Sequence, residues 1–250
     1  MGNSNAGAVT PARESRAPAR GAVDALDGAL LAEIHAINAA GIDLLAQRAA
    51  ELTAASPPDG ARGAGGATVP GTGLVLPPGP PPAAWMGLDA AQRRRLAAQP
   101  FLLLGVGLED AARWRALVDD VLAAQGAQRI AESRPRTAAM IHARLLVHYG
   151  WHLARIAPLT AGLVAGMAAG STAALRECRI EHLDALASRG VHWLRPRWLD
   201  APSLWSDLLQ AAQTDAAGLA RTAALRAVQR VGAALAAAAP AVDGAVMPTR

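Results

Sequence analysis

Alanine fills 63 of the 250 positions, and leucine recurs among these alanines at helical spacing. Alanine has the highest helix propensity, whereas the alternating runs of β-branched and aromatic residues that favour strands are nearly absent. The pattern predicts an all-α protein. All 24 basic residues are arginine, a bias typical of GC-rich genomes, so arginine content alone does not indicate a nucleic-acid-binding surface. The net charge of +4 is also mild for this length.

Cysteine usage and the ends of the chain exclude several classes of protein. Cys178 is the only cysteine, which excludes an internal disulfide and a zinc ribbon and indicates a reducing compartment, the cytoplasm. Residues 1–21 lack the apolar core of a signal peptide and predict a disordered leader, and residues 241–250 predict a disordered tail. The stretch from Ile156 to Leu175 is uncharged, but it is mostly Ala, Gly and Thr and contains Pro158, which argues against a membrane span.

Periodicity and the positions of proline and glycine divide the chain into two helical halves, residues 22–125 and 126–240. Within the first half, Pro57–Pro82 predicts a flexible linker, because 15 of its 26 residues are Pro or Gly. Phe101–Leu108 is the apolar stretch expected to be extended. Helices are expected over residues 23–53, 89–99, 110–125, 136–157, 158–170, 179–188, 202–213 and 216–239.

Comparison of the chain with itself indicates that the two halves share one plan. At an offset of 90 residues Leu96-Ala97 falls on Leu186-Ala187, and Trp114 agrees with Trp205 to within one residue. Each half then has a long helix, a short helix ending in Leu-Ala, an apolar extended piece and a Trp-bearing helix, which predicts two copies of one packing unit. A further match, at an offset of 107, joins Ile34-His35-Ala36 to Ile141-His142-Ala143.

The first predicted helix carries an Ile37-Asn38 pair followed by Leu-Leu-Ala-Gln-Arg at residues 44–48. These residues resemble the N-terminal helix of the FlhD family, whose members pair with FlhC to activate bacterial flagellar genes. The next part of the family pattern resembles this chain through Gln92, Leu96, Ala97, Leu102 and Asp110, and again in the second half through Leu186, Ala187, Arg197, Trp198 and Asp200.

The resemblance covers residues 26–114. It implies a transcriptional regulator subunit that forms a homodimer or a tandem pseudo-dimer, docks an FlhC-like partner and reaches DNA only within that complex. The chain departs from the family in three ways: the spacing from Asn38 to Leu44 is one residue longer, a Pro/Gly-rich linker replaces a compact connection, and a family protein is about half as long. The cysteine that bridges family dimers would fall at Leu104 and Leu194.

Two basic clusters with aromatic neighbours are the candidates for contact with DNA phosphates. One is Arg93, Arg94 and Arg95, and the other comprises Arg195 and Arg197 in the segment Val191–Asp200. In the alternative interpretation, three consecutive helical arginines point in three directions, and Arg197 stacks on a neighbouring indole in a packed corner.

Apolar and small residues supply the candidate partner or oligomer interface. The apolar extended segments Phe101–Leu104 and Val191–Leu194 are expected to pair with each other or with the same segments of a second chain, as exposed strand edges tend to do. A ladder of glycines on the helix expected to reach residue 170 would let another helix approach closely, or would pack inside the same chain. The interface candidates are Phe101, Leu102, Leu103, Leu104, Trp193, Leu194, Gly162, Gly166 and Gly170.

No activated nucleophile, carboxylate pair or closed ligand set emerges, so the sequence predicts a non-enzymatic protein without cofactor or metal. His148 and His152 stand four residues apart, as do Cys178 and His182, a spacing that allows zinc ligation from two helices. Structural histidines and a buried thiol are the expected interpretation. The alternative to the regulator is a helical scaffold or surface-coating protein that does not contact DNA.

Overall fold

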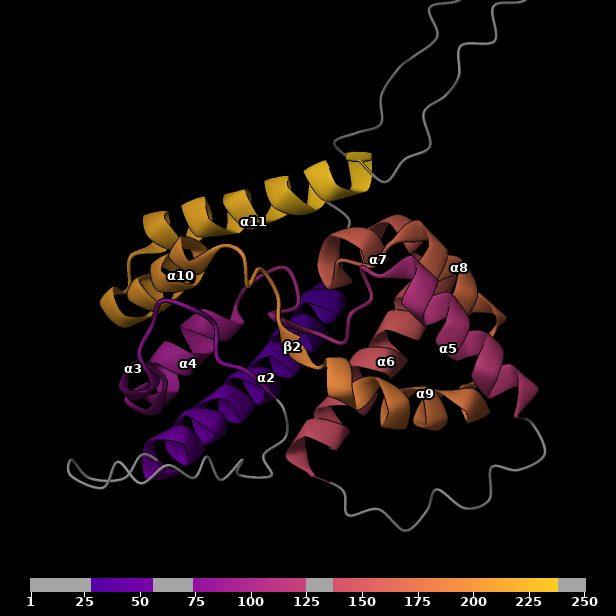
Figure 1. Cartoon of the computed structure of the whole chain (residues 1–250). Coiled ribbons are helices and arrows are strands. Elements are labelled where there is room, and N and C mark those ends of the chain that lie inside the picture. The colour runs from indigo at the N-terminus through magenta and orange to yellow at the C-terminus, as the bar shows by residue number, and fades with distance from the viewer. Residues whose placement is uncertain (1–27, 56–73, 125–136, 238–250) are drawn as a thin grey trace, which may run out of the picture.

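Helices account for nearly all of the regular structure. The computed structural model describes residues 28–55, 74–124 and 137–237, and these residues form ten α-helices and one pair of two-residue strands (Figure 1). The predicted all-α class is confirmed. The expected leader, the expected tail and linker residues 57–73 lie outside the described residues.

Helix α2 (Gly28–Ala55) is the axis of one lobe. It packs its buried apolar side chains against α3 (Pro82–Met86) and α4 (Ala90–Ala97). Helix α4 begins with a capping box: the Asp89 carboxylate accepts from the backbone N–H of Gln92 at 2.8 Å, and the Gln92 side-chain oxygen accepts from the backbone N–H of Asp89 at 2.9 Å. Two first-turn donors are thereby satisfied.

Helix α6 (Ala138–Ile156) is the axis of the other lobe. It packs against α7 (Pro158–Ala165), α8 (Ala169–Glu177) and α9 (Leu183–Gly190). Two 3₁₀ turns, η2 (Ile180–His182) and η3 (Val191–Trp193), flank α9. Helices α2 and α6 also contact each other, so the lobes are joined along their longest helices.

The Trp-bearing helices are exchanged between the lobes. Helix α5 (Ala111–Ala123) follows α4 in the chain but packs against α8 and α9, whereas α10 (Pro202–Thr214) follows α9 but packs against α4. Figure 1 shows α5 beside α8 in one lobe and α10 under α11 (Ala217–Ala237) in the other. The predicted halves are therefore not separate bodies, because the first half contributes α5 to the lobe around α6 and the second half contributes α10 and α11 to the lobe around α2.

The exchange occurs where the two extended segments pair. Strands β1 (Leu104–Gly105) and β2 (Arg195–Pro196) are antiparallel, with Leu104 opposite Pro196 and Gly105 opposite Arg195. The two halves do pair within the chain, but the prediction that Val191–Leu194 is the extended partner is wrong: Val191–Trp193 form the turn η3, and the paired residues are Arg195 and Pro196. Strand β2 lies 91 residues after β1, and α10 lies 91 residues after α5 with the same length of 13 residues.

Trp114 of α5 and Trp205 of α10 lie in matching surroundings. Both are fully buried, and each indole N–H donates to a backbone carbonyl eight residues earlier in the chain, at 3.2 Å for Trp114 and 2.7 Å for Trp205. Each ring also makes an edge-to-face contact with an aromatic ring from the other half. These rings are Trp193 for Trp114, at 5.9 Å between centroids, and Trp85 for Trp205, at 5.7 Å.

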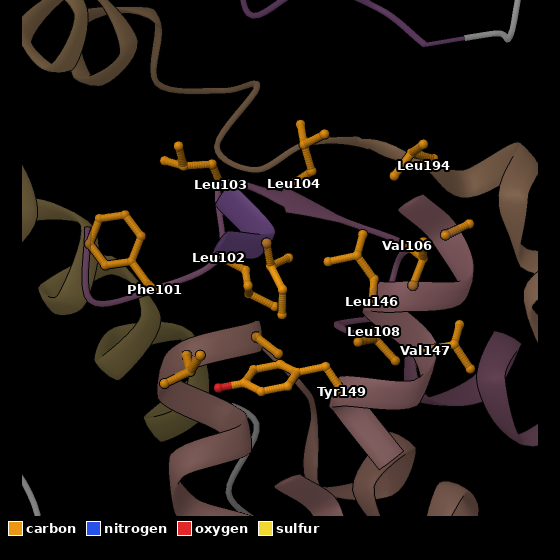
Figure 2. Close-up of a cluster of buried hydrophobic side chains, with 14 of the residues drawn as sticks. Phe101, Leu102, Leu103, Leu104, Val106, Leu108, Leu146, Val147, Tyr149 and Leu194 are labelled. Carbon is orange, nitrogen blue, oxygen red and sulfur yellow. The ribbon is translucent and has the colours of Figure 1, made fainter. Parts of the chain in front are cut away.

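The segment Phe101–Leu108 runs through the middle of the core, between α6 and the chain around Leu194 (Figure 2). Asn38 of α2 supports its backbone, because the amide donates to the Phe101 carbonyl at 2.8 Å and accepts from the Leu103 amide at 2.9 Å. An extended segment in an apolar core needs such partners, since an unpaired buried backbone group is destabilising.

The helix expected to reach residue 170 ends instead at Ala165. Gly166 closes α7 in the left-handed conformation with φ +65°, a cap that glycine adopts without a steric penalty. Helix α8 then begins at Ala169, and the axes of α7 and α8 differ by 119°. The predicted glycine ladder is therefore wrong as a single helix face: Gly162 lies in α7, Gly166 at its cap and Gly170 in α8.

The last part of the expected linker is packed, not flexible. Leu74 is 1% exposed, and its carbonyl accepts a hydrogen bond from Arg48 Nε at 2.9 Å. Gly79, with φ +103°, lies against Pro202 and Ser206 of α10. The prediction of flexibility over residues 74–82 is wrong because composition does not register the contacts that Leu74 makes with α2 and Gly79 makes with α10.

Candidate functional site

The three arginines of α4 point to three different places. Arg93 forms an ion pair with Asp43 at 2.7 Å. The Nε of Arg95 donates to the Ala212 carbonyl at 2.7 Å and lies 3.6 Å from Asp215. Arg94 is exposed and has no hydrogen-bond or ion-pair partner within the described part of the chain. The helix thus presents one unpaired cation, not a continuous basic surface.

The two arginines that follow η3 differ from each other. Arg195 is exposed and forms an ion pair with Glu109. Arg197 is partly buried: its Nη1 donates to the carbonyls of Leu102 at 3.1 Å and Val164 at 2.8 Å, and its guanidinium lies over the Trp198 ring at 4.4 Å. Burial lowers the pKa of Arg197 to about 10. The packed-corner interpretation therefore describes Arg197.

A pocket of about 490 Å³ lies beside the β1–β2 pair. Arg195 and Arg197 line it together with Glu109 and Asp200, whereas none of the α4 arginines does. Helix α11 supplies one wall through Arg230, Val231 and Ala234, and Arg230 forms an ion pair with Asp200. No sequence pattern indicates this pocket, because its walls come from segments far apart in the chain.

The apolar interface candidates lie inside the chain. Figure 2 shows the side chains of the first extended segment and Leu194 within one cluster. Phe101, Leu102, Leu103 and Leu104 are each at most 2% exposed and Leu194 is 3% exposed, while Trp193 is partly buried against Trp114. Because these side chains are buried where the two lobes pack against each other, they are not available to a second chain.

The candidate glycines also serve internal packing. A Cβ at Gly166 would lie 2.5 Å from Arg197 Nη2, so this glycine makes room for the buried guanidinium. A Cβ at Gly170 would lie 2.8 Å from the Ala111 side chain, so Gly170 lets α8 approach the start of α5. Gly162 is buried within α7. A surface for a partner helix is not built from these three residues.

The cysteine and histidines of the zinc hypothesis do not gather. Within the described residues, no three His, Cys, Asp or Glu side chains lie close enough to hold a metal ion. Cys178 is buried, its thiol faces the Ala174 carbonyl at 3.7 Å, and burial raises its pKa to about 11. His148 lies 3.4 Å from Asp184 on α9. A thiol of high pKa is a poor nucleophile and a poor ligand.

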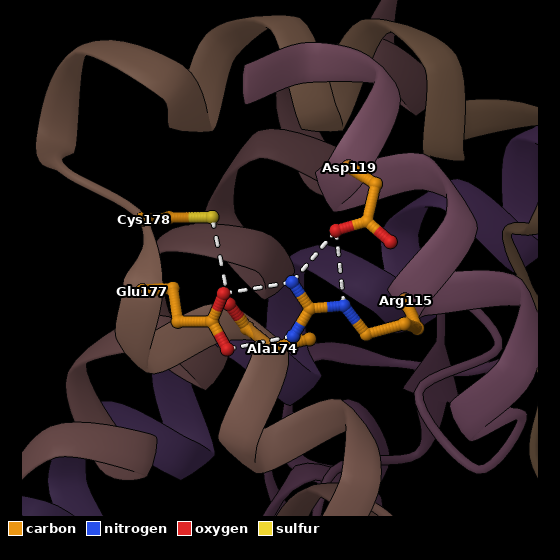
Figure 3. Close-up of polar contacts among 5 residues, drawn as sticks. All are labelled: Arg115, Asp119, Ala174, Glu177 and Cys178. Carbon is orange, nitrogen blue, oxygen red and sulfur yellow. Dashed lines mark hydrogen bonds and ion pairs between the residues drawn. The ribbon is translucent and has the colours of Figure 1, made fainter. Parts of the chain in front are cut away.

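Near Cys178, the most connected charged group is Arg115 (Figure 3). Its guanidinium on α5 bridges Asp119, one turn along the same helix, and Glu177 at the end of α8, with N···O distances of 2.6–2.7 Å. Hydrogen bonds from Arg115 hold the pKa of both carboxyls below their ordinary values. The cluster joins two helices and leaves no free base or acid for catalysis.

Among the described helices, α2 is long and apolar enough to cross a membrane, and the bent pair α7–α8 meets the same criterion if the two helices are counted as one span. In the fold, α2 packs its apolar side chains against α3, α4 and α6.

A search of protein-family models, of curated proteins and of solved structures finds no match to this chain.

Proposed function

We propose that the chain is a tandem form of the FlhD-like unit, acting in the cytoplasm as a transcriptional regulator subunit that contacts DNA only together with an FlhC-like partner. The observation that carries this proposal is the exchange of α5 and α10 about the β1–β2 pair at a constant offset of 91 residues. Two half-length units that associate by exchanging a helix would produce this arrangement, and a chain containing both holds its own dimer partner.

The state of the candidate arginines supports dependence on a partner. Four of the five are engaged with carboxylates or carbonyls of the chain itself. Non-specific DNA affinity comes from exposed cations that neutralise phosphates, so a chain in which Arg94 is the exposed candidate without a partner among the described residues binds DNA weakly by itself. Catalysis and a cofactor have no part in this role.

The test is a gel-shift measurement on a flagellar promoter fragment, with the full chain, a purified FlhC-like protein, and both together. We expect a shift with both proteins that exceeds the shift with either one and weakens as salt increases, because phosphate contacts release counterions. A shift of equal size without the FlhC-like protein contradicts partner dependence.

A pair of matched variants sharpens the test. Arg94→Ala removes the unpaired candidate cation. It should lower the slope of the logarithm of the DNA-binding constant against the logarithm of salt concentration, the salt slope, by about one unit. Arg176→Ala removes an equally exposed cation from α8, outside the candidate set, and should leave the slope unchanged. An equal effect of both variants would mean that net charge, and not a contact at α4, governs binding.

The alternative function is a helical scaffold or surface-coating protein without DNA contact. The engagement of Arg93, Arg95, Arg195 and Arg197 within the chain favours it. It predicts no shift of promoter DNA in any combination, which the same gel-shift measurement detects.

A further inference from the structure

We propose that the pocket beside β1 and β2 binds a small carboxylate ligand with a compact apolar body, anchored by Arg197. The volume of about 490 Å³ is within the range of small-molecule sites. This inference is independent of the proposed regulatory function, because it concerns neither the partner nor the arginines of α4.

The charges that line the pocket do not balance. Arg195 is paired with Glu109, and Arg230 is paired with Asp200. Arg197 has no carboxylate within 4 Å of its nitrogens in the part of the chain that the structure describes, although it is the most enclosed of the three. Glu109 attracts it from a longer distance, but that carboxylate is already paired with Arg195. A buried cation without a paired anion is destabilised, and an anionic ligand would compensate it.

The free donors of Arg197 match a carboxylate. Nη1 is engaged with the carbonyls of Leu102 and Val164, whereas Nε and Nη2 donate to no acceptor among the described residues. A guanidinium edge with two parallel N–H groups donates two hydrogen bonds to a carboxylate in bidentate geometry. One unbalanced cation suits a singly charged carboxylate better than a phosphate monoester, which carries nearly two charges at neutral pH.

The remaining walls suit an apolar ligand body. Pro196, Leu199, Val231 and Ala234 line the pocket, and glycines at 105, 107 and 166 leave its surface without further side chains. Trp198 adopts φ +54°, a backbone conformation that is rare for a bulky residue. This conformation accompanies the placement of the indole over the Arg197 guanidinium, and such outliers gather at ligand sites.

The probes are hexanoate, its neutral counterpart hexanamide, and inorganic phosphate, added to the full chain. The readout is the indole N–H resonance of Trp198 in a ¹H–¹⁵N spectrum, assigned by its loss in Trp198→Phe. We expect a saturable shift with hexanoate, at least tenfold weaker binding of hexanamide, and no displacement of hexanoate by equimolar phosphate. Equal binding of hexanamide, displacement by phosphate, or no saturable shift with hexanoate would overturn the proposal.

Two variants of the α11 wall separate pocket binding from a surface effect. Ala234→Phe places a ring in the pocket, and because Ala234 is exposed the change leaves the core intact. Ala233→Phe makes the same change at the neighbouring exposed residue, which does not line the pocket. Hexanoate affinity should fall at least tenfold in Ala234→Phe and stay within twofold in Ala233→Phe. Unchanged affinity in Ala234→Phe would place the ligand elsewhere and refute the site.

Discussion

Each lobe receives one Trp-bearing helix from the other half of the chain, α5 or α10, but a different kind of helix contact covers it in each lobe. In the lobe around α6, helix α8 covers α5, and Arg115 joins the two helices through Glu177. In the lobe around α2, helix α11 covers α10, and the side chains that α11 buries are small: Ala223, Ala227 and Val231. The two lobes therefore have the exchanged Trp-bearing helices in common, and they differ in how α8 and α11 pack on those helices.

Removing the tryptophan from either exchanged helix should destabilise the protein by a similar amount. We expect Trp114→Ala and Trp205→Ala each to lower the free energy of unfolding by about 3–5 kcal/mol, because each leaves a large cavity and an unpaired backbone carbonyl. Urea unfolding of the two variants measures this. A loss in one variant that is less than half of the loss in the other would show that the two tryptophans have different roles.

His142 and His35, which occupy equivalent positions in α6 and α2, should contribute differently to the pH dependence of stability. His142 of α6 is 4% exposed, and burial lowers its pKa to about 4, whereas His35, its counterpart at an offset of 107, is partly exposed. Between pH 6.5 and 4 the unfolded His142 binds a proton and the folded one does not, so stability falls as the pH falls through this window. A shift of this size corresponds to about 3 kcal/mol.

Unfolding measured from pH 7 to pH 4 tests this expectation. His142→Leu should flatten the decline, and His35→Leu, the matched change on α2, should retain it. An equally steep decline in His142→Leu would assign the pH dependence to other groups.

The local elements were largely predictable because they depend on neighbouring residues. Residues that are close together in the sequence determine the apolar face of α2, the capping box at Asp89 and the start of α10 at Pro202. The break at Gly166 is not predictable from local sequence because glycine in an Ala-rich run fits both a helix interior and a cap, and the side chain that leaves no room for a Cβ at this position is Arg197, 31 residues away.

The candidate site was less predictable, because it depends on long-range contacts. Arginine clusters in the sequence carry no record of the carboxylates and carbonyls that engage them in the fold, as with Arg93 and Asp43. The offset between Trp114 and Trp205 did indicate matching places, but not that α5 and α10 are exchanged. The pocket needs α11 beside β2, which no local pattern indicates.

A polar residue in the core marks a second difference between the lobes. Asn38 holds the Phe101 carbonyl and the Leu103 amide, and the position 107 residues later is Leu145, which is 40% exposed. We expect Asn38→Leu to cost about 2–3 kcal/mol, because it leaves buried backbone groups unpaired. Urea unfolding should show less than about 0.5 kcal/mol for Leu145→Asn. A similar cost for both variants would remove the special role of Asn38.

The smallest expected difference lies at the starts of the exchanged helices. The third amide of α5, at Arg113, donates to the Asp110 carboxylate at 3.0 Å, whereas the equivalent amide of α10, at Leu204, donates to the Ala201 carbonyl at 3.0 Å. Asp110→Ala should therefore cost about 1 kcal/mol, the usual value for a lost N-cap. Ala201→Ser should change stability by less than about 0.5 kcal/mol, because the amide that its hydroxyl would cap already has an acceptor. A stabilisation by Ala201→Ser as large as the loss in Asp110→Ala would show that α10 begins with an unsatisfied donor and that the two helix starts are equivalent after all.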